Sequence, residues 1–274
     1  MGIGEQGGTC SVHAETKKRD QTYVMSGHHC HQSYELFYVH QGACRFLIAD
    51  GFFDLRAGDF ILIPPLFLHY TRYMFGPCTR TVVMFDRRDV TGEVMRAMPQ
   101  AEQLFSAAAV FRAPQSGRGR LEACLEQMEA EERVDDGCSG PLRRFKLQEL
   151  LLLCARSCDF LPGRPNDLRT TDSHVLKAAR YISDNYMQPL TTEDVAGAVG
   201  FSPSYLSRRF RSSAGIGLHE YIVFVRLQHA ARELLETADS ITTIALRCGF
   251  SDSNYFKDSF KKKFGVTPRD YRKL

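Results

Sequence analysis

Two stretches, VAGAVGFSPSYLSRRF at residues 195–210 and IALRCGFSDSNYFKDSF at residues 244–260, are copies of one pattern. Each opens on a β-branched residue and an alanine, passes through Gly-Phe-Ser, and then carries a tyrosine and a phenylalanine. The copies are offset by 49 positions through the serine and by 50 from the tyrosine onward, because the second holds one inserted residue. An internal repeat indicates fold more strongly than any single motif, and this one predicts a C-terminal region built from two similar units.

Each copy carries the signals of two helices joined by a tight turn. In the first, Thr191 and Asp194 have the spacing of a capping box, which satisfies free amides where a helix begins. Gly200 suits the left-handed turn that ends this helix, and Ser202 with Pro203 suits the start of the next one. The corresponding places in the second copy are held by Ser240, Gly249 and Ser251. Each copy is therefore a predicted helix-turn-helix, the motif that places its second helix in the major groove of DNA.

The segment between the two units, Leu218 to Thr237, is predicted to form one long helix because its apolar residues recur at helical spacing. A rigid connector of this kind would hold the two reading helices at a fixed separation. Helices that enter successive major grooves on one face of DNA lie about 34 Å apart, which is one turn of the duplex.

Helical spacing divides the second helix of each unit into an inner apolar face and an outer polar face. The outer side chains can contact base edges, arginine with guanine, asparagine with adenine and aspartate with the amino group of cytosine. The alternative, two ordinary solvated faces, is disfavoured because the pattern occurs twice. The residues predicted to contact DNA are Ser204, Ser207, Arg208 and Arg211 in the first unit and Ser253, Asn254, Lys257, Asp258, Lys261 and Lys262 in the second.

The C-terminal hundred residues resemble the AraC/XylS family of transcriptional regulators. The resemblance rests on Gly249-Phe250-Ser251-Asp252, Tyr255-Phe256, Phe260-Lys261, Gly265-Val266-Thr267-Pro268 and Tyr271-Arg272. It implies an all-α domain of two helix-turn-helix units, with base-reading positions at Ser204, Ser207, Arg208, Ser253, Asn254, Lys257 and Asp258. Asp258 departs from the family, which often has a basic or neutral residue there. Since phosphate repels a carboxylate, we expect the second unit to bind more weakly or to read cytosine.

Length and charge fit a two-domain regulator. The chain has 274 residues, enough for two separate cores, and a net charge of +3. Basic residues gather near the C-terminus around Lys261-Lys262-Lys263, where contact with phosphates would position the protein on DNA without reading its sequence. No apolar run approaches the roughly 18 residues of a membrane helix. Residues 1–20 lack the apolar core of a signal peptide and are predicted to be a disordered lead-in. The nine scattered cysteines favour reduced thiols and a cytoplasmic protein.

The N-terminal half shows short β-strand patterns separated by turn dipeptides such as Asp50-Gly51 and Gly58-Asp59. Seven strands at such regular spacing suggest a closed barrel or sandwich, so the expected fold class is α+β. The candidate strands are Thr22–Ser26, Tyr34–His40, Cys44–Ala49, Phe52–Arg56, Phe60–Ile63, Leu68–Tyr73 and Thr81–Phe85.

Histidines and a glutamate are clustered early in this region. His29 and His31, two apart on a strand, would point the same way, and Glu35 and His69 could complete a set of four ligands. Imidazole and carboxylate ligands suit Zn, Fe, Ni or Mn. The spacing resembles the two motifs of the cupin superfamily, small β-barrels that hold a metal or an organic ligand, although Leu66 and Tyr73 depart from the second motif. Three interpretations stay open: a metal site, the polar lining of an effector pocket, or structural histidines. The pocket wall is expected to include Tyr34, Phe37 and Tyr38.

A helix is predicted for Val90–Phe105, followed by a helical hairpin within residues 113–160. Its expected inner positions are Leu121, Cys124, Leu125, Met128, Leu147, Leu150, Leu151, Cys154 and Cys158. In the AraC family the corresponding hairpin usually forms the dimer contact, while burial within the monomer is the alternative. The predicted organisation is a lead-in at 1–20, a cupin-like barrel at 21–112, the hairpin at 113–160, a linker at 161–172 and the DNA-binding domain at 173–274.

The predicted function is sequence-specific regulation of transcription, with a small-molecule effector such as a sugar or other polar metabolite bound in the barrel. The resemblance also implies activation of a promoter, a homodimer, and RNA polymerase as a partner beside the DNA operator. One alternative is a metal-responsive regulator that uses His29, His31, Glu35 and His69. A metal-dependent cupin enzyme with a DNA-binding appendage is disfavoured, because an enzyme of that kind has no need of a tandem DNA-reading domain.

Overall fold

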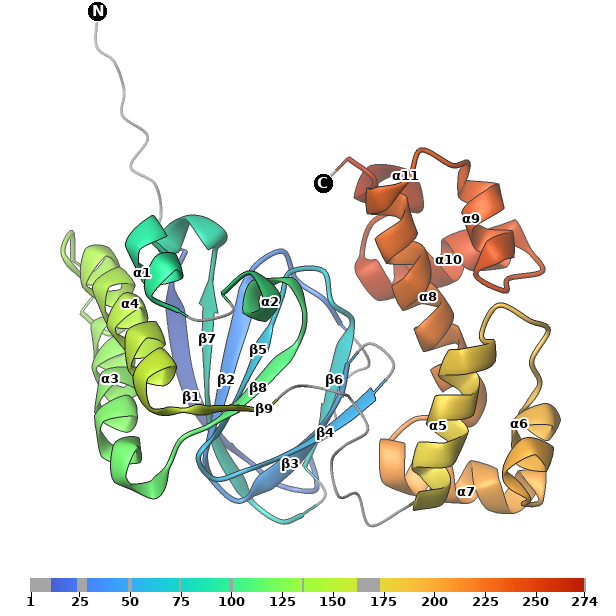
Figure 1. Cartoon of the computed structure of the whole chain (residues 1–274), viewed down its shortest axis with the longest axis horizontal. Helices are drawn as coiled ribbons and strands as arrows, with labels where there is room; N and C mark the ends of the chain where they lie inside the picture. The colour runs from blue at the N-terminus through green and yellow to red at the C-terminus, as the bar shows by residue number, and fades with distance from the viewer. Residues whose placement is uncertain are drawn as a thin grey trace, which may run out of the picture.

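The computed structural model describes residues 11–23, 29–48, 51–73, 75–98, 101–134, 136–161 and 173–273. A β-rich domain occupies the middle of the molecule, with two long helices on one side and a C-terminal group of helices on the other (Figure 1). This is the α+β arrangement predicted from the sequence. Within the described ranges, no helix is long and apolar enough to span a membrane.

The β-rich domain consists of two sheets. The larger has the strand order β1-β7-β2-β5-β8-β9 and the smaller the order β4-β3-β6. The strands are β1 His13–Arg19, β2 Tyr34–Gln41, β3 Ala43–Ile48, β4 Gly51–Arg56, β5 Asp59–Ile63, β6 His69–Arg72, β7 Cys78–Phe85, β8 Ala109–Arg112 and β9 Asp159–Leu161. The six predicted strands from Tyr34 to Phe85 are therefore confirmed to within a few residues. The candidate Thr22–Ser26 extends beyond the described residues.

Strand β1 differs from the prediction of a disordered lead-in through Asp20. It pairs antiparallel with β7 over its whole length, from His13 opposite Met84 to Arg19 opposite Cys78. Its sequence HAETKKR is polar on both faces, which hides the alternation that marks a half-buried strand. The charged side chains suit an edge strand, since they discourage pairing with another chain.

Side chains on strand β2 alternate between two cores. Leu36 and Tyr38 belong to a cluster under the helical hairpin, whereas Phe37 and Val39 pack inside the barrel. The hairpin consists of α3 Arg118–Glu131 and α4 Ser139–Ser157, and all its predicted inner residues lie in the first of these cores. The chain returns from the hairpin to the large sheet as β9.

The helix predicted for Val90–Phe105 is two short helices, α1 Gly92–Ala97 and α2 Ala101–Ser106. The first ends at Met98, which has the extended conformation φ −93°, ψ 113°. Met98 precedes Pro99 in the sequence, and a residue before proline is sterically driven out of the helical region. Single turns of 3-10 helix lie at η1 Arg87–Asp89 and η2 Gln115–Gly117.

The C-terminal domain contains the two predicted helix-turn-helix units and the long helix between them. Its helices are α5 Ser173–Asn185, α6 Thr192–Val199, α7 Pro203–Ala214, α8 Leu218–Glu236, α9 Ile241–Arg247, α10 Ser253–Phe264 and α11 Pro268–Tyr271. Helices α6 and α7 form the first unit, α9 and α10 the second, and α8 connects them (Figure 1).

The helix ends follow the local signals in the sequence with one shift. Thr191 and Asp194 form the capping box, Gly200 ends α6 with a φ of 80°, and Ser202 caps α7. In the second unit α10 is capped by Asp252, whose carboxylate accepts bonds from two backbone amides, and not by Ser251. The inserted residue of the second copy explains the shift, because the cap keeps its distance from the tyrosine and not from the glycine.

Candidate functional site

The outer faces of α7 and α10 carry the residues predicted to contact DNA. On the inner faces, Leu206 and Phe210 in α7 and Phe256 and Phe260 in α10 are fully buried. These apolar anchors orient the polar side chains outward. Exposed positions are Ser204, Arg208, Arg211, Asn254, Lys257, Asp258, Lys261 and Lys262, while Ser207 and Ser253 are half-buried.

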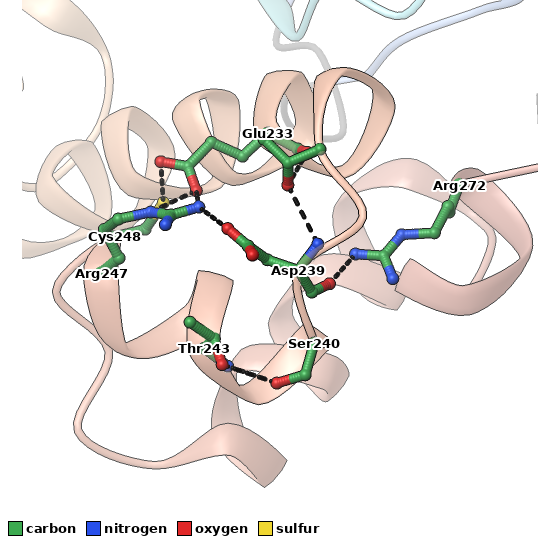
Figure 2. Close-up of polar contacts among 8 residues, drawn as sticks. Glu233, Asp239, Ser240, Thr243, Arg247, Cys248 and Arg272 are labelled. Carbon is green, nitrogen blue, oxygen red and sulfur yellow. Dashed lines mark hydrogen bonds and ion pairs between the residues drawn. The ribbon is translucent and has the colours of Figure 1, made fainter.

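A polar network ties the second unit to the end of the long helix (Figure 2). Arg247 at the end of α9 donates to Glu233 of α8 through Nε at 2.8 Å, and to Asp239 through Nη2, also at 2.8 Å. Arg272 donates to the backbone oxygen of Asp239 at 2.5 Å. The network spans α8, α9 and the C-terminal end, so it helps to fix the orientation in which α10 is presented.

Inside the barrel, His29, His31, Glu35 and His69 converge, and each offers a ligand atom within 4.8 Å of the others. His31 Nε2 lies 3.0 Å from Glu35 Oε2, and His69 Nε2 lies 3.4 Å from the same oxygen. His69 is 1% exposed and Glu35 6% exposed. The structure therefore brings together all four of the predicted ligands.

The protonation of two of these histidines is fixed by the backbone. His31 Nδ1 lies 2.6 Å from the carbonyl oxygen of Ser33, and His69 Nδ1 lies 2.9 Å from that of Phe67. A carbonyl oxygen can only accept, so each Nδ1 carries the proton and, in neutral imidazole, each Nε2 presents a lone pair to Glu35. This tethering of Nδ1 is the usual second-shell arrangement of metal-binding histidines.

The carboxylate at the centre of the cluster is stabilised in its charged form. Burial by itself raises the pKa of Glu35, but the interactions with His31 and His69 outweigh it and hold this pKa well below the usual range. His69 Nε2 is buried and makes no hydrogen bond to any described residue. A cation between these groups would satisfy the carboxylate and the imidazole nitrogens together.

His29 and His31 reach the cluster in a different way from the one predicted. They do not lie on a regular strand; His29 forms an isolated bridge with His69, with backbone hydrogen bonds of 3.1 and 3.0 Å in the two directions. The rings of His29 and His69 are 4.2 Å apart, closer than the 6.1 Å between those of His29 and His31. Pairing across the barrel, and not alternation along one strand, thus places His29.

A cavity of about 570 Å³ adjoins the cluster. Strands β1, β2, β6 and β7 contribute to its lining, which includes His29, Glu35, Phe37, His69, Thr71, Tyr73, Arg80, Val82 and Met84. Phe37 faces it as predicted, but Tyr34 and Tyr38 do not. Tyr34 stacks on Phe85 at 5.3 Å, and the Tyr38 hydroxyl donates to Glu122 at 2.7 Å, on the opposite face of β2. The prediction assigned both faces of this strand to the pocket, which the pleat forbids.

Strand β6 has one face toward the cavity and one toward the DNA-binding domain. His69 and Thr71 line the cavity, whereas Tyr70 packs in the core of the helical domain. Just before the strand, the backbone amide of Leu68 donates to Oε1 of the buried Gln228 in α8 at 3.0 Å. From the end of the strand, Arg72 donates to the backbone oxygens of Arg211 and Ser212 at 3.0 and 2.5 Å.

The contact between the domains is completed from strands β3 and β4. Arg45 is held by Asp54 at 2.5 and 2.7 Å and donates to the Ser213 hydroxyl at 2.7 Å. Phe52 stacks on Tyr221 of α8 with ring centroids 5.9 Å apart. Cations at the last carbonyls of a helix are favourable, so the barrel grips the C-terminal end of α7 while the predicted reading face of that helix stays exposed. The sequence contains no local signal for these contacts.

Comparisons with known proteins agree with this two-domain arrangement. Residues 16–142 match the model of the AraC-like ligand binding domain, and residues 195–274 match that of a helix-turn-helix domain. The HTH-type transcriptional regulator YijO of Escherichia coli K12 is 30% identical over 80% of this chain and 74% of its own length. The activator RhaS of Klebsiella pneumoniae is 26% identical over 89% and 86%, and the regulator YpdC of E. coli K12 is 33% identical over 61% and 58%. The chain belongs to the AraC family of transcriptional regulators.

Proposed function

We propose that this regulator binds a divalent transition metal at His29, His31, Glu35 and His69, and that ligand binding in the barrel controls how the two helix-turn-helix units hold DNA. The observation that carries this proposal is the pair of Nε2 lone pairs, on His31 and His69, directed at one carboxylate oxygen. Two protons could resolve the conflict only by burying two imidazolium groups. One divalent ion resolves it by coordination, and three imidazoles with a carboxylate suit Zn, Fe, Ni or Mn.

A metal in this position would act as a binding group for an effector and as a strut between strands. The cavity next to the cluster supports an organic effector as the second component, because 570 Å³ is far more than one ion needs. Strand β6 offers the route of control, since His69 on its inner face is one residue from contacts with α8 on its outer face. Ligand binding shifts the domain arrangement only if the two arrangements differ in affinity for the ligand.

The direct test is a metal titration of the full chain, followed by DNA binding with and without the metal. A duplex selected by the protein from random DNA serves as the operator. We expect stoichiometric uptake of one ion per chain and a change in operator affinity or in footprint on loading. Failure to take up Zn, Fe, Ni or Mn would contradict the metal proposal, and uptake without any change on DNA would contradict the control proposal.

On DNA, we propose that α7 and α10 read bases, while Lys261 and Lys262 contact phosphates. RhaS is named an activator, and we propose activation for this chain as well, with RNA polymerase as the partner at the promoter.

Replacing Lys261 and Lys262 together by alanine is expected to weaken selected and random DNA alike. Each lost phosphate contact lowers the slope of log affinity against log salt concentration by about 0.9, so the double variant should lose about 1.8. Fluorescence anisotropy across a salt series measures this slope. Lys17→Ala with Lys18→Ala, on strand β1 of the barrel, is the charge-matched control. An unchanged slope in the Lys261 and Lys262 variant would exclude the phosphate contacts.

We further propose that α4 forms a homodimer contact. Its inner residues are buried within the monomer, but its outer face exposes three apolar side chains at helical spacing, Leu142 at 41%, Phe145 at 66% and Leu152 at 38%. A stripe of this kind suits an isologous helix–helix contact.

Phe145→Ala is expected to raise the dimer dissociation constant at least about tenfold, because a buried phenylalanine contributes roughly 1.5–3 kcal/mol. Sedimentation velocity over a concentration series measures the constant. Val134→Ala is the control, since Val134 is 56% exposed but lies outside α4. Equal behaviour of the two variants would place the dimer contact elsewhere.

A further inference from the structure

We propose that the effector is a small organic acid whose carboxylate binds Arg80 at the end of the barrel cavity away from the His/Glu cluster. The inference rests on the proposed function of the cavity and adds to it the chemical class of the effector.

Arg80 and the cluster mark two separated ends of one cavity. On the paired strands β2 and β7, Glu35 lies opposite Met84 and Val39 opposite Arg80, so Arg80 is four residues further along the barrel wall. Four residues of strand span about 13 Å, of which an extended arginine side chain can bridge about half. The cavity runs between them and includes both ends in its lining.

The guanidinium of Arg80 is largely enclosed and poorly satisfied. Its side chain is 12% exposed. Nη1 has only long contacts with Glu15, at 3.4 Å to the backbone oxygen and 3.9 Å to the carboxylate. Nε is buried without a hydrogen bond to any residue in the described part of the chain. Such a charge is costly to enclose unless an anion reaches it.

Two other enclosed arginines of the barrel show what Arg80 lacks. Arg45 has a two-pronged pair with Asp54 at 2.5 and 2.7 Å, and Arg112 has one with Asp59 at 2.6 and 2.9 Å. Forked pairs of this kind are the strong form of the arginine–carboxylate interaction. Arg80 has the same planar fork and no protein carboxylate seated in it.

The acidic residues near the cavity are engaged elsewhere and do not serve as that partner. Glu35 is held by the histidines, Glu132 pairs with Arg143 at 2.6 Å, and Glu129 pairs with Arg133 at 3.4 Å. Glu15 is 55% exposed and pairs with Lys17. These acids also disfavour a phosphate, whose second charge they would repel, so a carboxylate is the better match.

The walls around Arg80 suit a short carbon chain. The guanidinium lies 5.8 Å from the centre of the Phe37 ring, and Tyr73 lies beside it with Tyr23 packed edge-on at 5.8 Å. A flat or linear acid could therefore place one carboxylate on Arg80, its carbon chain against aromatic rings, and a second oxygen at the cluster.

Glutarate and adipate are suitable probes, with their diamides as neutral analogues of equal length and inorganic phosphate as the competing anion. Calorimetry on the metal-loaded full chain should show a dicarboxylate binding at least about tenfold more tightly than its diamide and more tightly than phosphate. Tighter binding of phosphate, or equal binding of the diamide, would overturn the proposal.

Arg80→Gln should weaken the dicarboxylate at least about tenfold, the lower end for a hydrogen bond between charged groups. Arg80→Lys should weaken it less, because it keeps the charge and loses the fork. Arg88→Gln is the control, since Arg88 is 70% exposed and does not line the cavity. Arg80→Gln should also unfold at no lower temperature than the wild type, because no protein carboxylate loses its partner. An unchanged dicarboxylate affinity or a marked loss of thermal stability would contradict the assignment.

Titration with the metal alone separates the two proposals. If Arg80→Gln loses the dicarboxylate and binds metal as the wild type does, both proposals stand. If the wild type takes up metal but no dicarboxylate, only the Arg80 proposal fails. If the wild type takes up no metal, the metal-site proposal fails.

Discussion

His31→Ala is expected to weaken metal binding by about 100- to 1,000-fold while leaving the affinity of the unliganded protein for DNA unchanged. Four-ligand sites hold zinc with roughly 10–16 kcal/mol, so one ligand accounts for about 2.5–4 kcal/mol. His31 is a suitable choice because its side chain is 19% exposed and its removal opens no large void in the core. The affinity is measured by competition with a chelator, and the DNA affinity on a selected duplex.

The control for this variant is His219→Ala, which removes an exposed histidine of α8. It should bind metal as the wild type does. The His31 variant should also lose the change in DNA binding that the metal produces. Wild-type metal affinity in His31→Ala would show that the cluster is a set of structural histidines, and loss of DNA binding without metal would show that the variant damages the fold.

Arg208→Ala is expected to weaken binding to a selected duplex by about 1–3 kcal/mol, roughly 5- to 150-fold, with binding to random DNA nearly intact. The physical reason is that an arginine fork on the O6 and N7 atoms of guanine discriminates one base, whereas phosphate contacts are the same on every sequence. Arg208 is exposed on the outer face of α7, and its Nε is 3.4 Å from the Ser204 carbonyl of the previous turn. It can therefore leave this weak contact for a base at little cost.

Arg209→Ala is the matched control, because it removes the same charge from the neighbouring position of the same helix, turned away from the predicted reading face. We expect the two variants to differ on the selected duplex and to agree on random DNA. Equal losses on both kinds of DNA for Arg208→Ala would reduce its role to a phosphate contact.

The helical domain was predictable because its signals are local. A capping box, a left-handed glycine and a serine followed by proline act within a few residues of chain, and the structure has each of them in place. The repeat then supplied the second unit. The cap of α10 was displaced by one residue because sequence offset alone does not say which side of an insertion keeps its geometry.

The barrel was predictable in its strands but less so in its faces. Alternation located β2 to β7, yet the polar β1 gave no such pattern, and β8 and β9 are separated by the whole helical hairpin. The inward face of β2 depends on the register with β5 and β7, so Tyr34 and Tyr38 could not be excluded from the pocket. Arg80 was missed for the same reason, since only its position opposite Val39 places it in the cavity.

Contacts between the domains lay beyond any reading of the sequence. Gln228 meets the amide of Leu68 across 160 positions of chain, and Arg45 meets Ser213 across 168. Each is an ordinary polar residue in its own segment, and its partner is determined by how two folded domains pack. The His/Glu cluster was found because three of its four members lie within seven residues of one another.

The account depends most on the claim that the duplicated helix-turn-helix units hold one duplex together. Hydroxyl-radical footprinting of the full chain on its selected duplex tests this claim directly. We predict two protected windows on the same face of the DNA, centred about 10–10.5 base pairs apart. A single protected window, or two windows on opposite faces, would contradict it.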